Sequence, residues 1–262
     1  MFMRFLTIMS ILCFFVSAKS EEREKIEENP RSMAVGGVSM LSSTFENPSL
    51  SALGLRTNLS VFYESKYLMS ELGTGKCMFQ SPQEWGTVGL ALSGFGYDRY
   101  NRLRASGQYA RFLSPSLALG VGVDLRSYYY EGVQERLFRF GFRFGALFNV
   151  SERLVLSAWN DSRKRLKDGK FVHRISGGGS LNLKSECRWL FEVETFQFDS
   201  WQYRTGFEYK VGKFFMRCGA RALPVEPSLG VGFDLSSFAF DFSASYHNQL
   251  GLTICGGTVF TF

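Results

Sequence analysis

Apolar and polar side chains alternate at every second position over most of this chain, from Leu59 to its last residue. The segment FRFGFRFGALF (138–148) is the clearest case, with phenylalanine at one set of positions and mainly arginine and glycine between them. A period of two is typical of β-strands whose two faces meet different surroundings. The pattern predicts fourteen strands, and because the second is short a count of twelve is the alternative. The predicted spans are 58–69, 75–81, 85–95, 104–112, 117–128, 137–148, 153–160, 171–183, 187–197, 201–210, 213–221, 228–235, 237–247 and 251–262.

Alternation by itself also fits a soluble β-sandwich. The lengths of the connections between strands distinguish a sandwich from a membrane barrel. Connections after odd-numbered strands are mostly longer than those after even-numbered strands. The longer ones are 96–103, 129–136, 161–170 and 222–228, and the tight ones include 81–84, 114–116 and 184–186. Long loops on one rim and short turns on the other are typical of an up-and-down outer-membrane barrel.

The aromatic residues support the same fold. Tyrosine and tryptophan gather near strand ends, where the interfacial girdles of a membrane barrel lie. The sequence finishes on TVFTF, with Phe262 in phase with Phe260, which resembles the assembly signal of outer-membrane barrels. The predicted fold class is therefore all-β: a transmembrane antiparallel up-and-down β-barrel of about fourteen strands, with an N-terminal plug or hatch segment. The phenylalanines of 138–148 then face lipid, because Arg there would cost about 2–4 kcal/mol at the midplane.

The first twenty residues, MFMRFLTIMSILCFFVSAKS, read as a secretory signal peptide. Arg4 supplies the basic region, an apolar run follows, and the small residues Ala18 and Ser20 suit cleavage before Glu21. We expect three parts: a signal peptide (1–20), an N-terminal periplasmic or plug segment (21–56) and the barrel (57–262). The expected location is the outer membrane of a Gram-negative cell.

Composition narrows the chemistry. The 262 residues include 27 Phe and 27 Gly, yet the mean hydropathy is only −0.06, because polar residues interleave with apolar ones. The net charge of +6 could suit nucleic acid, but for an exported protein we expect phosphate-bearing lipid, including lipopolysaccharide, or a solvated surface. The spacing of the cysteines indicates that they serve as small apolar residues within strands and do not form disulfides. No metal-ligand spacing occurs, and we expect no cofactor.

The predicted lumen face carries many charged side chains of both signs. One interpretation is a pore lining or a site for an anionic group, and the other is a network of ion pairs that fills the interior. Mixed signs on neighbouring strands favour pairing, whereas adjacent arginine rows would favour an anion-binding patch. The candidate anion-binding residues are Arg126, Arg139, Arg143, Arg204, Arg217 and Arg221.

Catalysis is not expected. Some outer-membrane barrels are lipid hydrolases that use a serine with a histidine, and this chain has only His173 and His247. Ser245 and His247 share a face but lie about 6.6–6.8 Å apart along a strand, too far for a direct hydrogen bond. A catalytic triad would need a partner from a neighbouring strand. Both histidines are expected near a rim, and the predicted class is a non-enzyme.

Two stretches resemble a known family. RSMAVGGVSMLSSTFENPSLSAL (31–53) resembles the glycine-pair and Asn-Pro segment of the long-chain fatty-acid transporter superfamily (FadL-like), and 85–125 resembles its first hairpins. The closest likeness is to the smaller barrels of the PorV/PorQ type, found with type IX secretion. The resemblance implies a fourteen-stranded barrel with a luminal hatch. It also implies either transport of hydrophobic ligands that leave through the barrel wall, or anchoring of secreted cargo. The chain departs from the family in having Asn47-Pro48-Ser49 in place of Asn-Pro-Ala, and in its short loops.

Two functions follow as expectations. The first is a plugged transport channel for small hydrophobic or amphipathic molecules, gated by residues that include Gly36, Gly37, Asn47 and Pro48. The second is a non-transporting outer-membrane component of a secretion or surface-assembly system, with a protein partner from that system. Expected partners are outer-membrane lipid, a hydrophobic small molecule or secretion proteins, and not nucleic acid.

Overall fold

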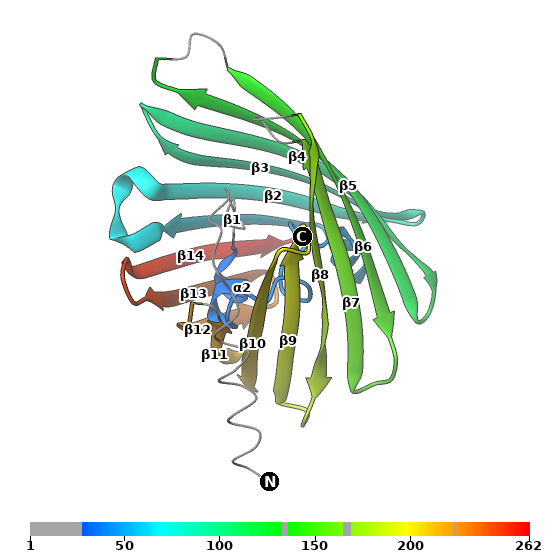
Figure 1. Ribbon diagram of the computed structural model, residues 1–262. Helices are drawn as coiled ribbons and strands as arrows, with labels where there is room; N and C mark the ends of the chain where they lie inside the picture. Colours follow the sequence, from blue (N-terminus) through cyan, green and yellow to red (C-terminus); the bar gives the residue numbers. More distant parts are fainter. Residues whose placement is uncertain (1–27, 133–135, 165–168, 223) are drawn as a thin grey trace.

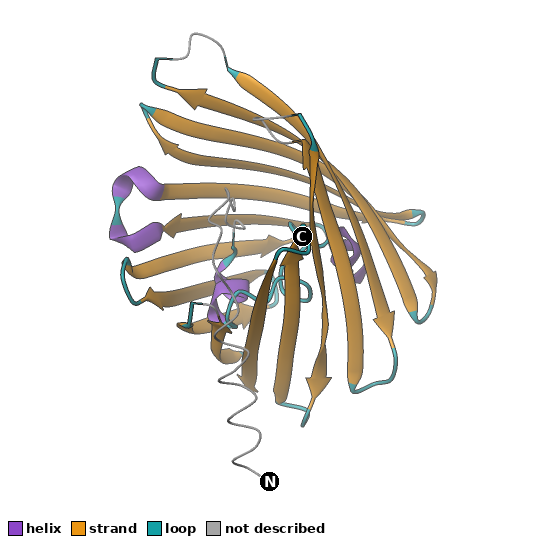
Figure 2. Cartoon of the chain, in the orientation of Figure 1, coloured by secondary structure: helices purple, strands orange, loops and turns teal. Residues whose placement is uncertain are grey.

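The computed structural model describes residues 28–132, 136–164, 169–222 and 224–262. Within them, fourteen antiparallel strands form one closed barrel in chain order (Figures 1 and 2). This confirms the predicted fold class and the larger strand count. The strands are β1 (Asn58–Ser65), β2 (Gly73–Gln83), β3 (Gly86–Tyr97), β4 (Tyr100–Ser114), β5 (Leu117–Tyr130), β6 (Leu137–Asn149), β7 (Leu154–Lys164), β8 (Phe171–Asn182), β9 (Cys187–Phe196), β10 (Ser200–Val211), β11 (Phe214–Ala222), β12 (Glu226–Leu235), β13 (Phe238–His247) and β14 (Gly251–Thr261). The predicted signal peptide lies outside the described residues.

Closure of the barrel depends on β1, which pairs on both sides. Val61 lies opposite Thr258 of β14 and opposite Cys77 of β2. A closed sheet has no free edge, so its backbone N–H and C=O groups pair within the sheet, which is the condition for a sheet to reside in lipid.

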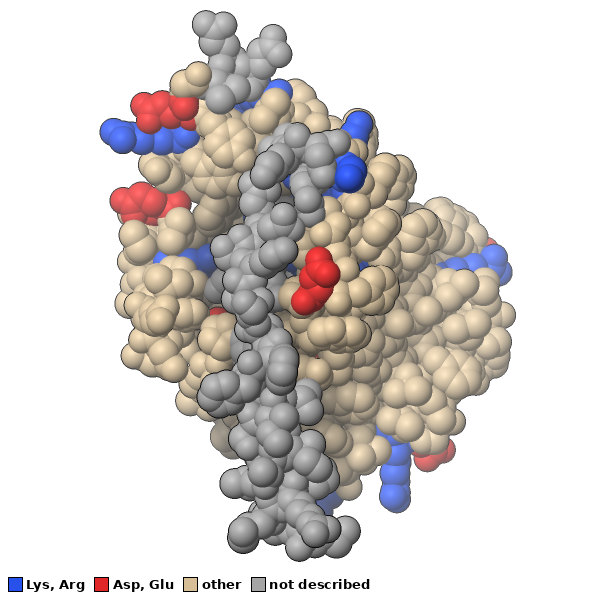
Figure 3. Space-filling view, viewed as in Figure 1, with Lys and Arg blue, Asp and Glu red and all other residues tan. Residues whose placement is uncertain are grey.

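The two faces of the strands meet different surroundings, as the alternation predicted. In β6, Phe140 and Phe144 are 66% and 55% exposed on the outer face, whereas Arg143 between them is fully buried on the inner face. Figure 3 shows that charged side chains are sparse over the outer wall. An outer face of this kind suits hydrocarbon, where burial of apolar surface contributes about 25 cal/mol per Å².

The connections define two rims. The short-turn rim consists of 84–85, 115–116, 150–153, 183–186, 212–213 and 236–237. The described residues of the opposite rim are 66–72, 98–99, 131–132, 136, 169–170, 197–199, 224–225 and 248–250. The connection 66–72 contains the 3₁₀ helices η2 (Lys66–Leu68) and η3 (Ser70–Leu72), so β1 ends earlier than predicted. Tyr67 and Leu68 both have φ 56°, which an extended strand does not allow.

The predicted long connection at 96–103 is wrong, because strands β3 and β4 continue almost to their turn. Tyr97 pairs with Tyr100, and the Phe95 ring meets the Tyr100 ring edge-on at 6.0 Å. Such cross-strand aromatic pairs stabilise a hairpin. Of the polar residues that suggested a loop, Asp98 and Arg99 form the exposed turn and Arg102 is buried on the inner face. Strand β7 likewise extends into the predicted connection 161–170, and its Arg163 is only 5% exposed.

Residues 28–54, called here the luminal segment, lie inside the barrel (Figure 1). The segment contains helix α2 (Pro30–Ala34) and the 3₁₀ helix η1 (Pro48–Leu53). Each begins with the same chemistry: Asn29 and Asn47 accept a backbone N–H at the helix start, and a proline follows at the first helical position. Asn caps the free N–H groups and proline has no N–H to lose there, so both Asn-Pro pairs start helices.

Glycines on the inner wall make room for the luminal segment. A Cβ placed on Gly206 of β10 would lie 2.6 Å from the Cβ of Val35, closer than real Cβ contacts allow. Gly219 of β11 and Gly230 of β12 likewise have no space for a side chain, because the backbone of Val35 and the Cβ of Ala34 occupy it. Two further glycines, Gly120 and Gly145, meet the segment where η1 begins. The wall is therefore shaped for this segment over strands on opposite sides of the barrel.

None of the helices in the described part of the chain has the length and apolar character needed to span a lipid bilayer.

Candidate functional site in the lumen

The first half of the luminal segment is fixed by a charged pair between α2 and β10. Arg31 donates from Nε and Nη2 to the two carboxylate oxygens of Glu208, at 3.0 and 2.9 Å. Glu208 also accepts from Arg217 Nε at 2.7 Å, and Arg217 in turn pairs with Asp241 of β13. Bidentate guanidinium–carboxylate contacts are among the stronger hydrogen bonds in proteins, so α2 is held firmly to β10 and is linked through Arg217 to β11 and β13.

A second anchor holds the start of the segment. Glu28 pairs with Arg221 of β11, which also lies 3.4 Å from Glu226 of β12. Glu226 is 3.7 Å from Nε2 of His247, so the chain of polar contacts continues to β13. This anchor lies toward the opposite rim, because Glu226 and His247 are at the ends of their strands there.

The third anchor is Glu192 of β9, whose carboxylate accepts hydrogen bonds from the backbone of the segment. The N–H groups of Ser39 and Met40 lie 2.6 and 3.0 Å from Oε2. Arg204 Nη1 contacts Oε1 at 2.9 Å, and its other terminal nitrogen lies 3.1 Å from Glu194. A buried carboxylate needs such donors to offset the loss of hydration.

The second half of the segment meets a cluster around Asp124 of β5. Arg104 and Arg143 lie 3.1 Å from Asp124, and Arg126 lies 3.4 Å from it. Arg104 reaches Glu46 of the segment at 3.5 Å, and Arg143 donates to the carbonyl of its neighbour, Phe45.

Asn47 and two glutamines complete the polar contacts. Asn47 Nδ2 donates to Ser157 Oγ of β7 at 2.7 Å, and the Ser51 hydroxyl accepts from Gln80 and Gln108. The segment is thus tied to the wall from β2 round to β13.

Apolar packing closes the space that the ion pairs leave. Val35, Val38 and Met40 pack with Trp159 and Leu190 of the wall. Phe45 packs with Met78 and Ala91, and Leu50 packs with Ala118 and Leu147. These clusters lie on different sides of the barrel, so the segment packs against several parts of the inner wall.

The structure places the six predicted anion-binding arginines at different positions. Arg126, Arg143, Arg204, Arg217 and Arg221 each lie within 4 Å of a carboxylate, in the pairs described above and, for Arg126, also Asp161 at 3.5 Å. Arg139 differs: its guanidinium lies over the Tyr128 ring at 4.7 Å, and within the described residues no carboxylate pairs with it. The adjacent arginine rows therefore share their charge with acids that the sequence placed on the same face.

The predicted gate residues lie at two separate points of the segment. Gly36 and Gly37 have φ 76° and 79°, a backbone conformation that favours glycine, and Gly36 N–H donates to Ser228 of β12. Asn47 and Pro48 are buried at the start of η1. The structure does not bring the glycine pair and the Asn47-Pro48 pair together into one gate.

Neither histidine forms a triad within the described residues. His173 is exposed on the outer face, and its Nδ1 lies 2.8 Å from the hydroxyl of Ser162 on β7. No carboxylate among the described residues pairs with His173. The four cysteines of the described chain are free thiols, and the described residues contain no cluster of His, Cys, Asp and Glu able to hold a metal ion.

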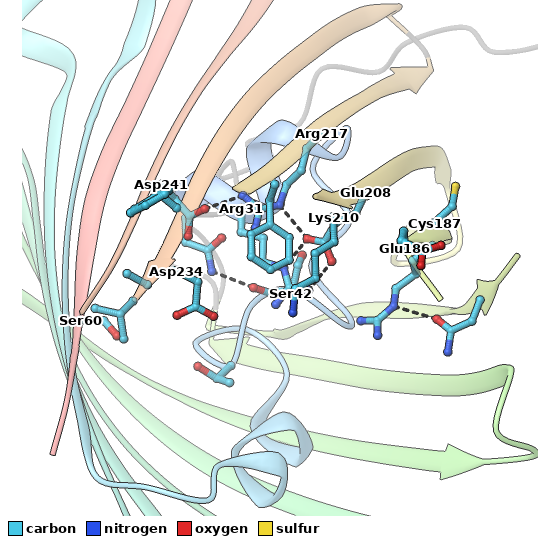
Figure 4. Close-up of a pocket in the computed structure, with 18 of the residues that line it drawn as sticks. Arg31, Ser42, Ser60, Glu186, Cys187, Glu208, Lys210, Arg217, Asp234 and Asp241 are labelled. Atoms are coloured by element: carbon cyan, nitrogen blue, oxygen red, sulfur yellow. Dashed lines mark hydrogen bonds and ion pairs between the residues drawn. The ribbon is translucent and has the colours of Figure 1, made fainter. Parts of the chain in front are cut away.

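A cavity of about 850 Å³ lies between the luminal segment and the short-turn rim (Figure 4). The turns 150–153 and 183–186 contribute to its mouth, and Arg31 and Ser42 of the segment to its inner end. Two of its cationic residues, Arg188 and Lys210, were not among the anion-binding candidates predicted from the sequence. The signal was present, because both alternate in phase with the predicted lumen residues of their strands.

The outer wall carries a separate hollow of about 460 Å³ over strands β2 to β6. Its lining is apolar, and it includes Leu90, Val123 and Phe140 with the small residues Ala105 and Gly107. Missing side-chain volume at these two positions leaves the hollow open to the surroundings of the barrel.

The fold is similar to that of solved channels, and these include a homologue of FadL, the family that the sequence resembles. Among solved structures, the CymD monoaromatic hydrocarbon channel matches with a TM-score of 0.68 at 12% identity, over 89% of this chain and 97% of that one. The Pseudomonas putida toluene transporter TodX matches with a TM-score of 0.67 at 11% identity (89% and 97%), and a Pseudomonas aeruginosa FadL homologue with 0.57 at 13% identity (89% and 96%). No protein-family model and no curated protein matches the sequence.

Proposed function

We propose that this chain is an outer-membrane transport channel for small hydrophobic or amphipathic molecules, closed by the luminal segment as a hatch. The observation that carries the proposal is the segment itself, which lies inside the barrel, packs against several parts of the inner wall and borders a large cavity. The likeness in fold to channels titled for monoaromatic hydrocarbons and toluene supports the same class of cargo. The proposed export of the protein rests on the interpretation of residues 1–20 as a signal peptide. The proposed boundary between the plug segment and the barrel, at residue 56, rests on the start of the first strand of the barrel wall.

In this proposal the short-turn rim faces the periplasm, as in other outer-membrane barrels. The ion pairs of Arg31, Glu46 and Glu28 hold the hatch, and opening requires that some of them exchange partners. The apolar hollow at Gly107 supports release of hydrophobic cargo through the wall into the membrane, as the family resemblance implies.

Deletion of residues 36–53 tests the hatch. The purified variant in planar bilayers should show a higher potassium chloride conductance than the full chain, because the barrel loses the residues that fill it. Uptake of the hydrophobic dye N-phenyl-1-naphthylamine by cells that express each form tests cargo entry. Conductance and uptake equal to those of the full chain would contradict the hatch. The Arg56→Gln variant, at an exposed position just after the segment, is the control.

One observation favours the alternative of a secretion or surface-assembly component. Several large apolar side chains are exposed on loops of the opposite rim, which would suit contact with a protein partner. They are Leu68 (58%), Met69 (49%), Phe198 (66%), Val225 (62%) and Leu250 (52%). Mass analysis of material purified from native membrane in mild detergent separates the two functions. A stoichiometric protein companion would favour the alternative, and a bound small molecule without a companion would favour the channel.

A further inference from the structure

The cavity at the short-turn rim has a surplus of positive charge on one wall. That wall is built by β9, β10 and β11 together with α2. It carries four cations, Arg31, Arg188, Lys210 and Arg217, and one carboxylate, Glu208. Asp241 of β13 also pairs with Arg217.

Two of the four cations are not neutralised. Arg188 lies opposite Glu208 in the strand register, but both oxygens of Glu208 already accept from Arg31 and Arg217. The only hydrogen bond of Arg188 within the described residues is from Nε to Asn182 Oδ1, at 3.0 Å. Its two terminal nitrogens are therefore available to the cavity. Lys210 lies over the Phe215 ring at 5.3 Å, and no described carboxylate pairs with it.

The remaining charges of the cavity do not cancel this surplus. At the mouth, Arg153 and Lys184 are matched in number by Glu152 and Glu186. Asp234 of β12 is the last carboxylate in the lining, and Figure 4 shows other side chains between it and Lys210. Counted over the whole lining, six cations stand against five carboxylates.

The other wall of the same cavity offers apolar surface. Phe62 of β1, Met78 of β2, Ala239 of β13 and Val259 of β14 belong to four consecutive strands of the barrel and all line the cavity. Polar residues such as Ser60 and Gln80 stand between them. A cationic wall facing a partly apolar wall across about 850 Å³ has the size and character of a small-molecule site.

We propose that this cavity binds an amphipathic organic anion, with its carboxylate on Arg188 and Lys210 and its apolar part on Phe62, Met78 and Val259. Arg188 presents two parallel N–H donors to a carboxylate, and Lys210 adds a second charge. The assignment deepens the proposed channel function by naming a ligand class, and it places the ligand on the short-turn side of the luminal segment.

Equilibrium dialysis of radiolabelled octanoate against the purified full chain in a non-ionic detergent tests the site, with protein-free micelles as the blank. The Arg188→Gln/Lys210→Gln variant should bind octanoate about tenfold more weakly, the loss expected for charged hydrogen bonds. The Lys213→Gln variant removes a cation from the adjacent turn, outside the cavity lining, and should bind as the unmodified chain does. Heat-modifiable electrophoretic mobility shows that each variant is a folded barrel.

A neutral ligand of the same length completes the test. Binding of 1-octanol should not change in the double variant, because octanol carries no charge. The Val259→Ser variant should weaken the binding of both octanoate and octanol. Octanoate binding unchanged in the double variant, or an equal loss for octanol, would overturn the proposed anion site. Dialysis measures binding and does not depend on transport. If deletion of residues 36–53 left the conductance unchanged, the hatch would be contradicted, but the octanoate-binding result would still hold.

Discussion

Arg31 of α2 donates to both carboxylate oxygens of Glu208 on β10, and this contact joins the luminal segment to the charged wall of the cavity. The same carboxylate accepts from Arg217. Movement of α2 away from the wall would therefore leave Glu208 with one partner and Arg31 without its carboxylate. The pair couples the position of the segment to the electrostatics of the proposed anion site.

The Arg31→Gln variant should loosen the segment without unfolding the barrel. Glu208 keeps Arg217, so we expect a loss of about 1–3 kcal/mol in the free energy of unfolding and more frequent conductance events in planar bilayers. Urea unfolding in lipid vesicles measures the first and single-channel recording the second. Arg56→Gln should change neither. A conductance identical to that of the full chain would show that this pair does not restrain the segment.

Replacement of Gly206 by alanine should displace the segment. The added methyl group would lie 2.6 Å from the Val35 Cβ, and overpacking of this kind costs about 1–3 kcal/mol. Gly177→Ala is the matched control, because nothing lies within 4 Å of the Cβ position there. Limited proteolysis of residues near Val35 measures the effect. Equal protection in both variants would mean that the glycine groove is not required for docking.

The Glu192→Gln variant should destabilise the folded barrel by about 3 kcal/mol, near the lower end for breaking a buried ion pair, since Arg204 still has Glu194. The amide also replaces the charged acceptor of the Ser39 and Met40 N–H groups. Urea titration in vesicles measures the change. Glu186→Gln removes a carboxylate from an exposed turn and should have little effect; similar losses in both variants would contradict a special role for Glu192.

Arginine in place of Phe142 should hinder insertion into lipid. Phe142 is 45% exposed on the outer face of β6, and Arg on a lipid face costs about 2–4 kcal/mol at the midplane and less near the interfaces. Folding yield into vesicles, read from electrophoretic mobility, is the measurement, and Phe142→Leu should fold as the original does. Unimpaired folding of the arginine variant would place this face outside the hydrocarbon.

Leucine in place of Gly107 should fill the apolar hollow on the outer wall. If cargo leaves there, uptake of N-phenyl-1-naphthylamine should fall severalfold while octanoate binding in the cavity stays unchanged. Gly94→Leu adds the same side chain on β3, outside the hollow lining, and serves as the control. Equal uptake in both variants would remove the hollow from the route.

The strands were predictable because each has lipid-facing and lumen-facing positions in strict alternation. The errors came where that signal was ambiguous. Polar residues between Asp98 and Leu103 resembled a loop, but Arg102 simply continues the inward face. The lumen charges were also visible in sequence, since Arg143 and Asp124 fall on inward positions of their strands. Nothing local, however, indicated which arginine would remain without an acid.

The sequence by itself determined the architecture: a closed barrel with phenylalanine outside, charge inside and an Asn-Pro-rich segment before the first strand. These features depend on period-two alternation and on helix-start chemistry, which act over a few neighbouring residues. Only the tertiary structure decided the path of the segment across the inward glycines, the closure of β1 on β14 and the partners of each arginine. Those depend on register and on contacts between residues as distant as Arg31 and Glu208. The proposed site at Arg188 likewise depends on them, because the carboxylate of Glu208 opposite it already accepts from Arg31 and Arg217.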